Sequence, residues 1–84
     1  MSPTPERLAE QWLRVYQANV AREIDRQALT YRELADRAGL RSHTTIHRWL
    51  HAKDSPTLTT VARVAHALRV TPLSLLTPQQ ERRP

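Results

Sequence analysis

The sequence predicts an all-α fold, a compact domain of five helices whose first helix is extended. Three observations indicate this class. Apolar residues recur at spacings of three and four along most of the 84 residues, as on the buried face of a helix. Threonine, serine and proline stand where these apolar segments begin, in positions typical of helix starts. The one glycine, Gly39, lies between two short apolar segments, where it can end a helix.

The first helix is expected to begin after Thr4, an N-cap residue that is followed by Pro5 at the first helical position. A single helix of up to about 24 residues, near 36 Å long, is the simplest interpretation. Asn19 could instead cap a second, separate helix. The apolar residues at helical spacing in this segment are Leu8, Trp12, Val15, Tyr16, Val20 and Ile24.

The next helix is predicted over residues 30–38. Thr30 and Glu33 have the spacing of a capping box, in which each side chain accepts a hydrogen bond from the other residue's backbone N–H. Gly39 then supplies the left-handed conformation that ends the helix. The residues expected to share its buried face are Leu34, Ala35 and Ala38.

A third helix follows a turn of about three residues, with Ser42 as its expected N-cap. Its buried face is expected to consist of Ile46, Trp49 and Leu50. Its outward face, which has no apolar residue and no acid, consists of His43, Thr44, His47, Arg48 and His51. Two helices joined by a short turn with a glycine, here within residues 30–51, are typical of a helix-turn-helix unit.

The rest of the chain predicts two more helices and a tail. A loop over residues 54–57 leads to the fourth helix, with Ser55 or Thr57 as its N-cap. The expected core residues of this helix are Leu58, Val61, Ala62, Ala65 and Leu68. Thr71 and Pro72 begin a short fifth helix, whose Leu73 and Leu76 are expected to close the core. The domain is thus expected over residues 1–76, and residues 77–84, with Arg82 and Arg83, are expected to be a solvated tail rather than a phosphate-binding arm.

From about residue 19 to residue 76 the sequence resembles the Cro and phage-repressor (Xre-type) helix-turn-helix family. The matching segments are LTYRELADRAGL (29–40), TTIHRWL (44–50), a proline at position 56 and TLTTVARVAHALRVTPLSLL (57–76). The resemblance implies a lambda-repressor-like domain of five helices that binds DNA. The family's first helix would correspond only to residues 20–27, so residues 5–19 are an N-terminal helical extension.

The chain departs from the family pattern at several positions. Tyr31 stands where the first residue of the second helix is usually glutamine, and one extra residue lies in the turn after Gly39. Ala52 and Arg69 stand where the family commonly has glycines. Those two corners are therefore expected to be built differently.

The resemblance places base contacts on His43, Thr44 and Arg48, and His47 shares their face. Helix geometry agrees, because residues at the start of a recognition helix and one turn later reach the floor of the major groove. Arg48 can bond guanine O6 and N7, and the Thr44 methyl suits a thymine methyl. The residues expected to contact phosphates are Tyr31, Arg32, Arg41, Ser42, Lys53, Ser55 and Thr57.

Two other kinds of site receive less support. His43, His47 and His51 are spaced so that two imidazoles could chelate a transition metal, but no carboxylate or thiolate ligand is near, and adventitious binding is the favoured interpretation. No metal or cofactor is therefore expected. An enzyme is not expected either, because the sequence has no cysteine, no glycine-rich phosphate loop and no paired carboxylates in an apolar setting.

The apolar residues of the extension, Leu8, Trp12, Val15 and Tyr16, have two interpretations. They could pack against their own domain, or they could form a dimer contact between two copies, because an uncovered aromatic stripe on a small domain is an exposed apolar patch.

Charge and composition favour a polyanionic partner. A net charge of +5 and a pI near 11 suit double-stranded DNA. The sequence has no apolar segment as long as a membrane span and no signal-peptide core, so a cytoplasmic protein of a bacterium or a phage-infected cell is expected. The predicted function is a transcriptional repressor that occupies a partly palindromic operator, most like a Cro-type regulator of a temperate phage. The alternatives are an antitoxin that binds a toxin protein and a helical interaction module without DNA binding.

Overall fold

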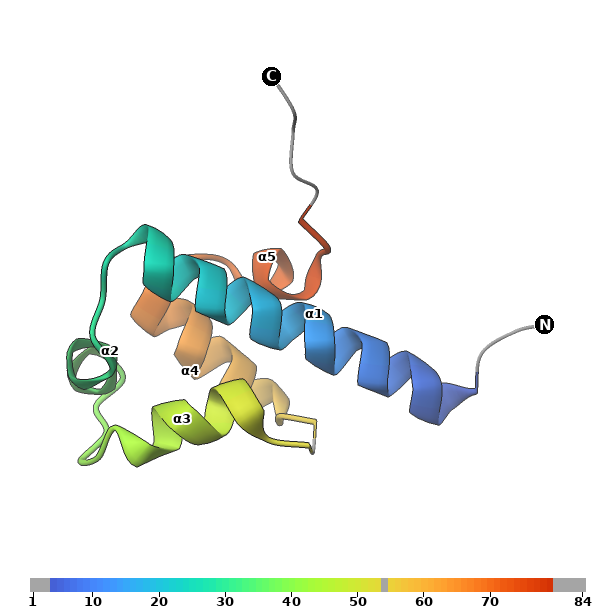
Figure 1. Cartoon of the computed structure of the whole chain (residues 1–84), viewed down its shortest axis with the longest axis horizontal. Coiled ribbons are helices and arrows are strands. Elements are labelled where there is room, and N and C mark those ends of the chain that lie inside the picture. Colours follow the sequence, from blue (N-terminus) through green and yellow to red (C-terminus); the bar gives the residue numbers. More distant parts are fainter. Residues whose placement is uncertain (1–3, 54, 80–84) are drawn as a thin grey trace, which may run out of the picture.

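The computed structural model describes residues 4–53 and 55–79. These residues form five helices and no strand, which confirms the predicted all-α class. No helix of this part of the chain is long and apolar enough to cross a membrane. The helices are α1 (Pro5–Arg26), α2 (Tyr31–Arg37), α3 (Thr44–His51), α4 (Leu58–Leu68) and α5 (Pro72–Leu76) (Figure 1).

Helix α1 is continuous for 22 residues, so the alternative of a break at Asn19 is wrong. The Thr4 hydroxyl accepts a hydrogen bond from the Arg7 N–H at 3.2 Å and caps the first turn, as expected. Figure 1 shows the N-terminal turns of α1 extending beyond the other helices. Asn19 is buried, and its side-chain amide fastens α5 to α1. It donates to the carbonyls of Ser74, Leu75 and Thr77 at 3.3, 2.8 and 2.9 Å.

The core lies between α1, α2, α3 and α4, and α5 closes it. Most predicted core residues are buried or partly buried, but three are exposed. Leu58 is 84% exposed because it is the first residue of α4, and Ala62 lies on the outer side of the same helix. Leu73 is 72% exposed, and Leu75 is buried in the core position that was predicted for Leu73. The buried residues of α4 are Val61, Val64, Ala65, Ala67 and Leu68.

The turns between the helices explain two departures from the family pattern. Gly39 has a φ of +72° and ends α2 as predicted. Arg69 adopts the same left-handed region, with a φ of +61°, although it has a side chain. Ala52 does not, because its φ of −65° and ψ of 149° are extended backbone. The expectation that both corners differ is therefore wrong for the α4–α5 corner, which keeps the glycine-like geometry, whereas the corner after α3 is built differently.

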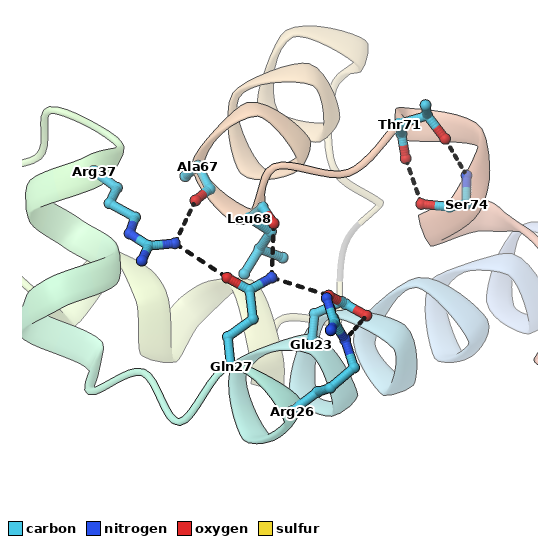
Figure 2. A network of polar contacts seen from close by, with 8 residues as sticks. All are labelled: Glu23, Arg26, Gln27, Arg37, Ala67, Leu68, Thr71 and Ser74. Atoms are coloured by element: carbon cyan, nitrogen blue, oxygen red, sulfur yellow. Dashed lines mark hydrogen bonds and ion pairs between the residues drawn. The ribbon is translucent and has the colours of Figure 1, made fainter.

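A polar network joins α1 and α2 to the end of α4 (Figure 2). Gln27 donates from Nε2 to the Leu68 carbonyl at 2.7 Å and to Glu23 Oε1 at 3.0 Å. Arg37 donates to Gln27 Oε1 at 3.1 Å, which fixes the orientation of that amide. The Arg26 guanidinium beside Glu23 lowers the pKa of the Glu23 carboxyl, so the network stays charged at neutral pH. It satisfies a C-terminal carbonyl of α4 where no intrahelical donor is available.

Candidate nucleic-acid interface

Helix α3 turns one face to the core and one face to solvent. Ile46 is fully buried and Trp49 is 9% exposed, as predicted for the inner face. The outer face is polar and carries no acid. Its exposed residues are Thr44, His47, Arg48 and His51, with His43 directly before the helix.

The start of α3 differs from the prediction by one residue. The N-cap position is occupied by His43, not Ser42, and the His43 side chain makes no capping hydrogen bond. Ser42 nevertheless accepts a bond from the Thr44 N–H at 3.1 Å and donates one to the Thr44 hydroxyl at 3.0 Å. The serine therefore satisfies one of the free N–H groups of the first turn from one position further out.

The end of α3 is held by Gln17 of α1, a residue that the sequence prediction did not include. Its Nε2 donates to the Ala52 carbonyl at 2.8 Å and to the Trp49 carbonyl at 3.4 Å. The sequence contained one signal for it, since Gln17 is four residues after Leu13 and three before Val20, at the margin of the apolar face of α1.

The residues predicted to contact phosphates belong to segments that precede and follow α3 in the chain (Figure 1). Helix α2 and the turn after it lie at the N-terminal end, and the segment before α4 follows the C-terminal end. Thr57, not Ser55, caps α4, because its hydroxyl accepts from the Thr60 N–H at 3.1 Å. All seven are exposed except Tyr31, which is partly buried against the core. They are Tyr31, Arg32, Arg41, Ser42, Lys53, Ser55 and Thr57.

A carboxylate already occupies the positive end of α2. Glu33 accepts from the Thr30 N–H at 2.8 Å, and the Thr30 hydroxyl accepts from the Glu33 N–H at 3.0 Å, which confirms the predicted capping box. The bond from the Thr30 N–H lowers the pKa of the Glu33 carboxyl, so it is ionised at neutral pH. The Glu33 carboxylate thus offsets part of the positive end of the α2 dipole, next to the side chains of Tyr31 and Arg32.

A groove of about 350 Å³ separates the middle of α1 from α3 and the segment before α4. Leu13 and Tyr16 line one side, and Arg48 and Ala52 line the other. The Tyr16 hydroxyl is buried and has no hydrogen-bond partner among the described residues. The groove is thus bounded by a residue of the DNA-reading prediction and by two residues of the N-terminal extension.

The apolar residues of the N-terminal extension differ in how far they are exposed. Tyr16 is only 1% exposed, so the suggestion that it forms a dimer contact is wrong, because its own domain already covers it. Leu8 and Trp12 remain 41% and 62% exposed, and Val15 is partly buried.

The histidines of α3 form no metal cluster. The rings of His47 and His51 lie 4.4 Å apart between centroids. In the described part of the chain, no group of three or more His, Cys, Asp or Glu residues could hold a metal ion.

Comparison with known proteins gives one result that bears on this surface. A family model described as helix-turn-helix matches residues 20–75. The match includes all of α2, α3, α4 and the α3 flanks, and it begins at Val20, within α1. Comparisons with curated proteins and with solved structures find no match.

Proposed function

Because the chain belongs to the Xre/Cro/lambda-repressor-type helix-turn-helix family of DNA-binding regulators, we propose that it is a Cro-type repressor that occupies a specific operator through α3. The observation that carries the proposal is the outer face of α3. It is exposed, polar and free of acids, and it lies between two segments that carry cationic and hydroxyl side chains. Major-groove helices have this composition because they must bond base edges inside a negatively charged groove.

The base-reading residues in this proposal are His43, Thr44, His47 and Arg48. Arg48 lies on the exposed side of α3, one residue before the buried Trp49, so the core fixes the direction of its side chain. Its planar fork can donate two parallel hydrogen bonds to guanine. Thr44 presents its methyl group from the first turn, and the two histidines can each donate or accept one bond.

The phosphate-contacting residues position α3 without reading sequence. Arg41 and Ser42 precede the helix, and Lys53, Ser55 and Thr57 follow it, so both ends are anchored along the backbone. At the start of α2, Arg32 and the Tyr31 hydroxyl complete the set. Neutralising phosphates releases counterions, so affinity should fall steeply as salt concentration rises.

The partner that we propose for the exposed side chains of Leu8 and Trp12 is a second copy of the chain. At 100° per residue, Leu8 lies on the side of α1 opposite Gln17, which bonds α3. A contact through Leu8 therefore leaves α3 free for DNA. Sedimentation equilibrium should show association of the unmodified protein and a loss of it in Trp12→Ser. A monomer mass for the unmodified protein would contradict the dimer, and equal association of both proteins would contradict a contact through Trp12.

Selection of binding sites from random double-stranded DNA tests the proposed function. The protein should enrich one sequence, and that sequence should bind about 10³-fold or more tightly than random DNA at the same salt concentration. Inverted half-sites one helical turn apart would indicate two copies on one operator. Failure to enrich any sequence, by protein whose circular dichroism shows folded helices, would contradict sequence-specific binding.

A further inference from the structure

The N-terminal segment that precedes the family match contributes a side chain to the recognition helix. We infer that Gln17 is a positioning residue for DNA recognition, because its amide closes the C-terminal end of α3 in place of a glycine turn. The inference rests on the proposed function, since it concerns how accurately α3 is presented to DNA. Gln17 lies three residues before the matched region begins.

In the described residues, the end of α3 has no left-handed residue to close it. A left-handed residue after a helix lets following N–H groups bond the last carbonyls, and glycine does this most readily. Ala52 stands at that position in extended conformation, and among the described residues its backbone N–H donates to the Arg48 carbonyl at 2.8 Å. The carbonyls of Trp49 and Ala52 are bonded by Gln17 Nε2 instead.

Helix α3 depends on such contacts more than a longer helix would. It has eight residues, and isolated helices of this length are unstable in water. Its N-cap residue, His43, provides no side-chain capping bond, and Ser42 bonds one backbone N–H of the first turn, that of Thr44. Its geometry is therefore set by packing of Ile46 and Trp49 and by the bonds that fix its ends.

Gln17 bonds the segment between a residue assigned to base reading and a residue assigned to phosphate binding. The residue before Trp49 is Arg48, which we assign to base reading, and the residue after Ala52 is Lys53, which we assign to phosphate binding. Gln17 bonds the carbonyls of Trp49 and Ala52, the first and the last of the four residues in between. A shift of this segment would move the Arg48 guanidinium and the chain that follows α3 relative to each other.

A neighbouring pair of side chains supports the same role. Leu13 and Tyr16 from the same turns of α1 line the groove that faces Arg48 and Ala52. Tyr16, directly before Gln17, is buried, so this turn of α1 is packed against the domain. Gln17 therefore reaches α3 from a turn of α1 that is held in place by packing.

Gln17→Ala, Gln17→Glu and the control Gln11→Ala test the inference. Gln11 is an exposed glutamine on the projecting turns of α1. Gln17→Ala should lower affinity for the selected site by about 3- to 10-fold, the worth of one neutral hydrogen bond, and leave affinity for random DNA within about 2-fold. Gln17→Glu should be weaker still, because a carboxylate cannot donate and would face two carbonyl oxygens. Gln11→Ala should bind as the unmodified protein does.

Two further measurements separate a positioning role from a general loss of stability. Without DNA, hydrogen exchange of the Ala52 amide should be about 3- to 10-fold faster in Gln17→Ala, while exchange of the Leu34 amide in α2 stays unchanged. Adding Ala52→Gly to Gln17→Ala should recover part of the lost DNA affinity, because glycine can adopt the left-handed turn.

Each result decides the inference. It is overturned if folded Gln17→Ala keeps the full preference for the selected site, or if it loses affinity for selected and random DNA equally. Unchanged exchange at Ala52 also overturns it. If the unmodified protein prefers no sequence, the proposed function fails, and the exchange data still report whether Gln17 closes α3.

Discussion

The hydroxyl of Ser42 accepts a hydrogen bond from the Thr44 N–H at 3.1 Å and donates one to the Thr44 hydroxyl at 3.0 Å. These two bonds order the first turn of α3, whose N-cap residue makes no side-chain bond of its own. They also fix the rotamer of a residue that we assign to base reading. One serine therefore connects the turn after α2 with the surface proposed to meet DNA.

Replacement of this serine tests that connection. Ser42→Ala should lower the free energy of unfolding by about 0.5–1.5 kcal/mol, because the Thr44 N–H loses its partner. Ser42→Thr keeps the hydroxyl and should lose less. Urea unfolding followed by circular dichroism measures both values, and equal stability of Ser42→Ala and the unmodified protein would show that water replaces the serine fully.

The corner after α4 should gain stability from a glycine. Arg69 has a φ of +61°, a conformation that strains a residue with a Cβ atom. Arg69→Gly should raise the free energy of unfolding by about 0.5–1 kcal/mol. Thermal unfolding in parallel with the unmodified protein measures the change.

Ala52→Gly is the matched control for that substitution. Ala52 stands at the other family glycine position, but its φ of −65° is unstrained for alanine. Glycine there should only increase the conformational entropy of the unfolded chain and should lower stability by about 0.4–1 kcal/mol. The same sign for both substitutions would contradict the different geometry of the two corners.

Alkaline pH should destabilise the fold through Tyr16. Burial raises the pKa of Tyr16 to about 12, above the value of 10.0 for an exposed tyrosine. The folded protein therefore holds the hydroxyl proton more tightly than the unfolded chain does. The free energy of unfolding should consequently fall as pH rises from about 10 to 12. Because the hydroxyl has no hydrogen-bond partner in the described part of the chain, Tyr16→Phe should be as stable as the unmodified protein at pH 7, or more stable by up to about 1 kcal/mol.

Urea unfolding of both proteins at pH 7 and at pH 10.5 measures this difference. Tyr16→Phe should lose less stability between the two pH values. A loss of more than about 1 kcal/mol in Tyr16→Phe at pH 7 would show that the hydroxyl is bonded, for example by an ordered water in the groove.

The helices that could be predicted from sequence are those with strong local signals. Thr30 and Glu33 bond only to each other's turn, so residue types and spacing were sufficient to predict the start of α2. The inner face of α3 was predicted because Ile46 and Trp49 follow helical spacing and pack on one side. Local chemistry and tertiary packing agree in these segments.

The errors have a different origin. Helix α5 has five residues, too few to show a period, and its rotation is fixed by bonds from the distant Asn19. Sequence spacing therefore could not decide between Leu73 and Leu75. Gln17 was missed for the same reason, since its bonds join residues 35 and 32 positions apart. A polar residue near a core is visible in the sequence, but the carbonyl that it meets is not.

Arg48 and Arg41 separate sequence reading from attraction to phosphate. Arg48 projects from the outer face of α3, and Arg41 lies in the turn before it. Arg48→Ala should therefore weaken binding to the selected site by about 1–3 kcal/mol and barely change binding to random DNA. Arg41→Ala should weaken binding to all sequences alike and lower the magnitude of the salt slope by about one.

Binding isotherms of Arg48→Ala on selected and on random DNA, over a salt series and with Arg41→Ala as control, test the account most directly. The account predicts a loss confined to the selected site and a salt slope on random DNA equal to that of the unmodified protein. An equal loss on both DNAs would mean that Arg48 binds phosphate, and that α3 does not read bases through this residue.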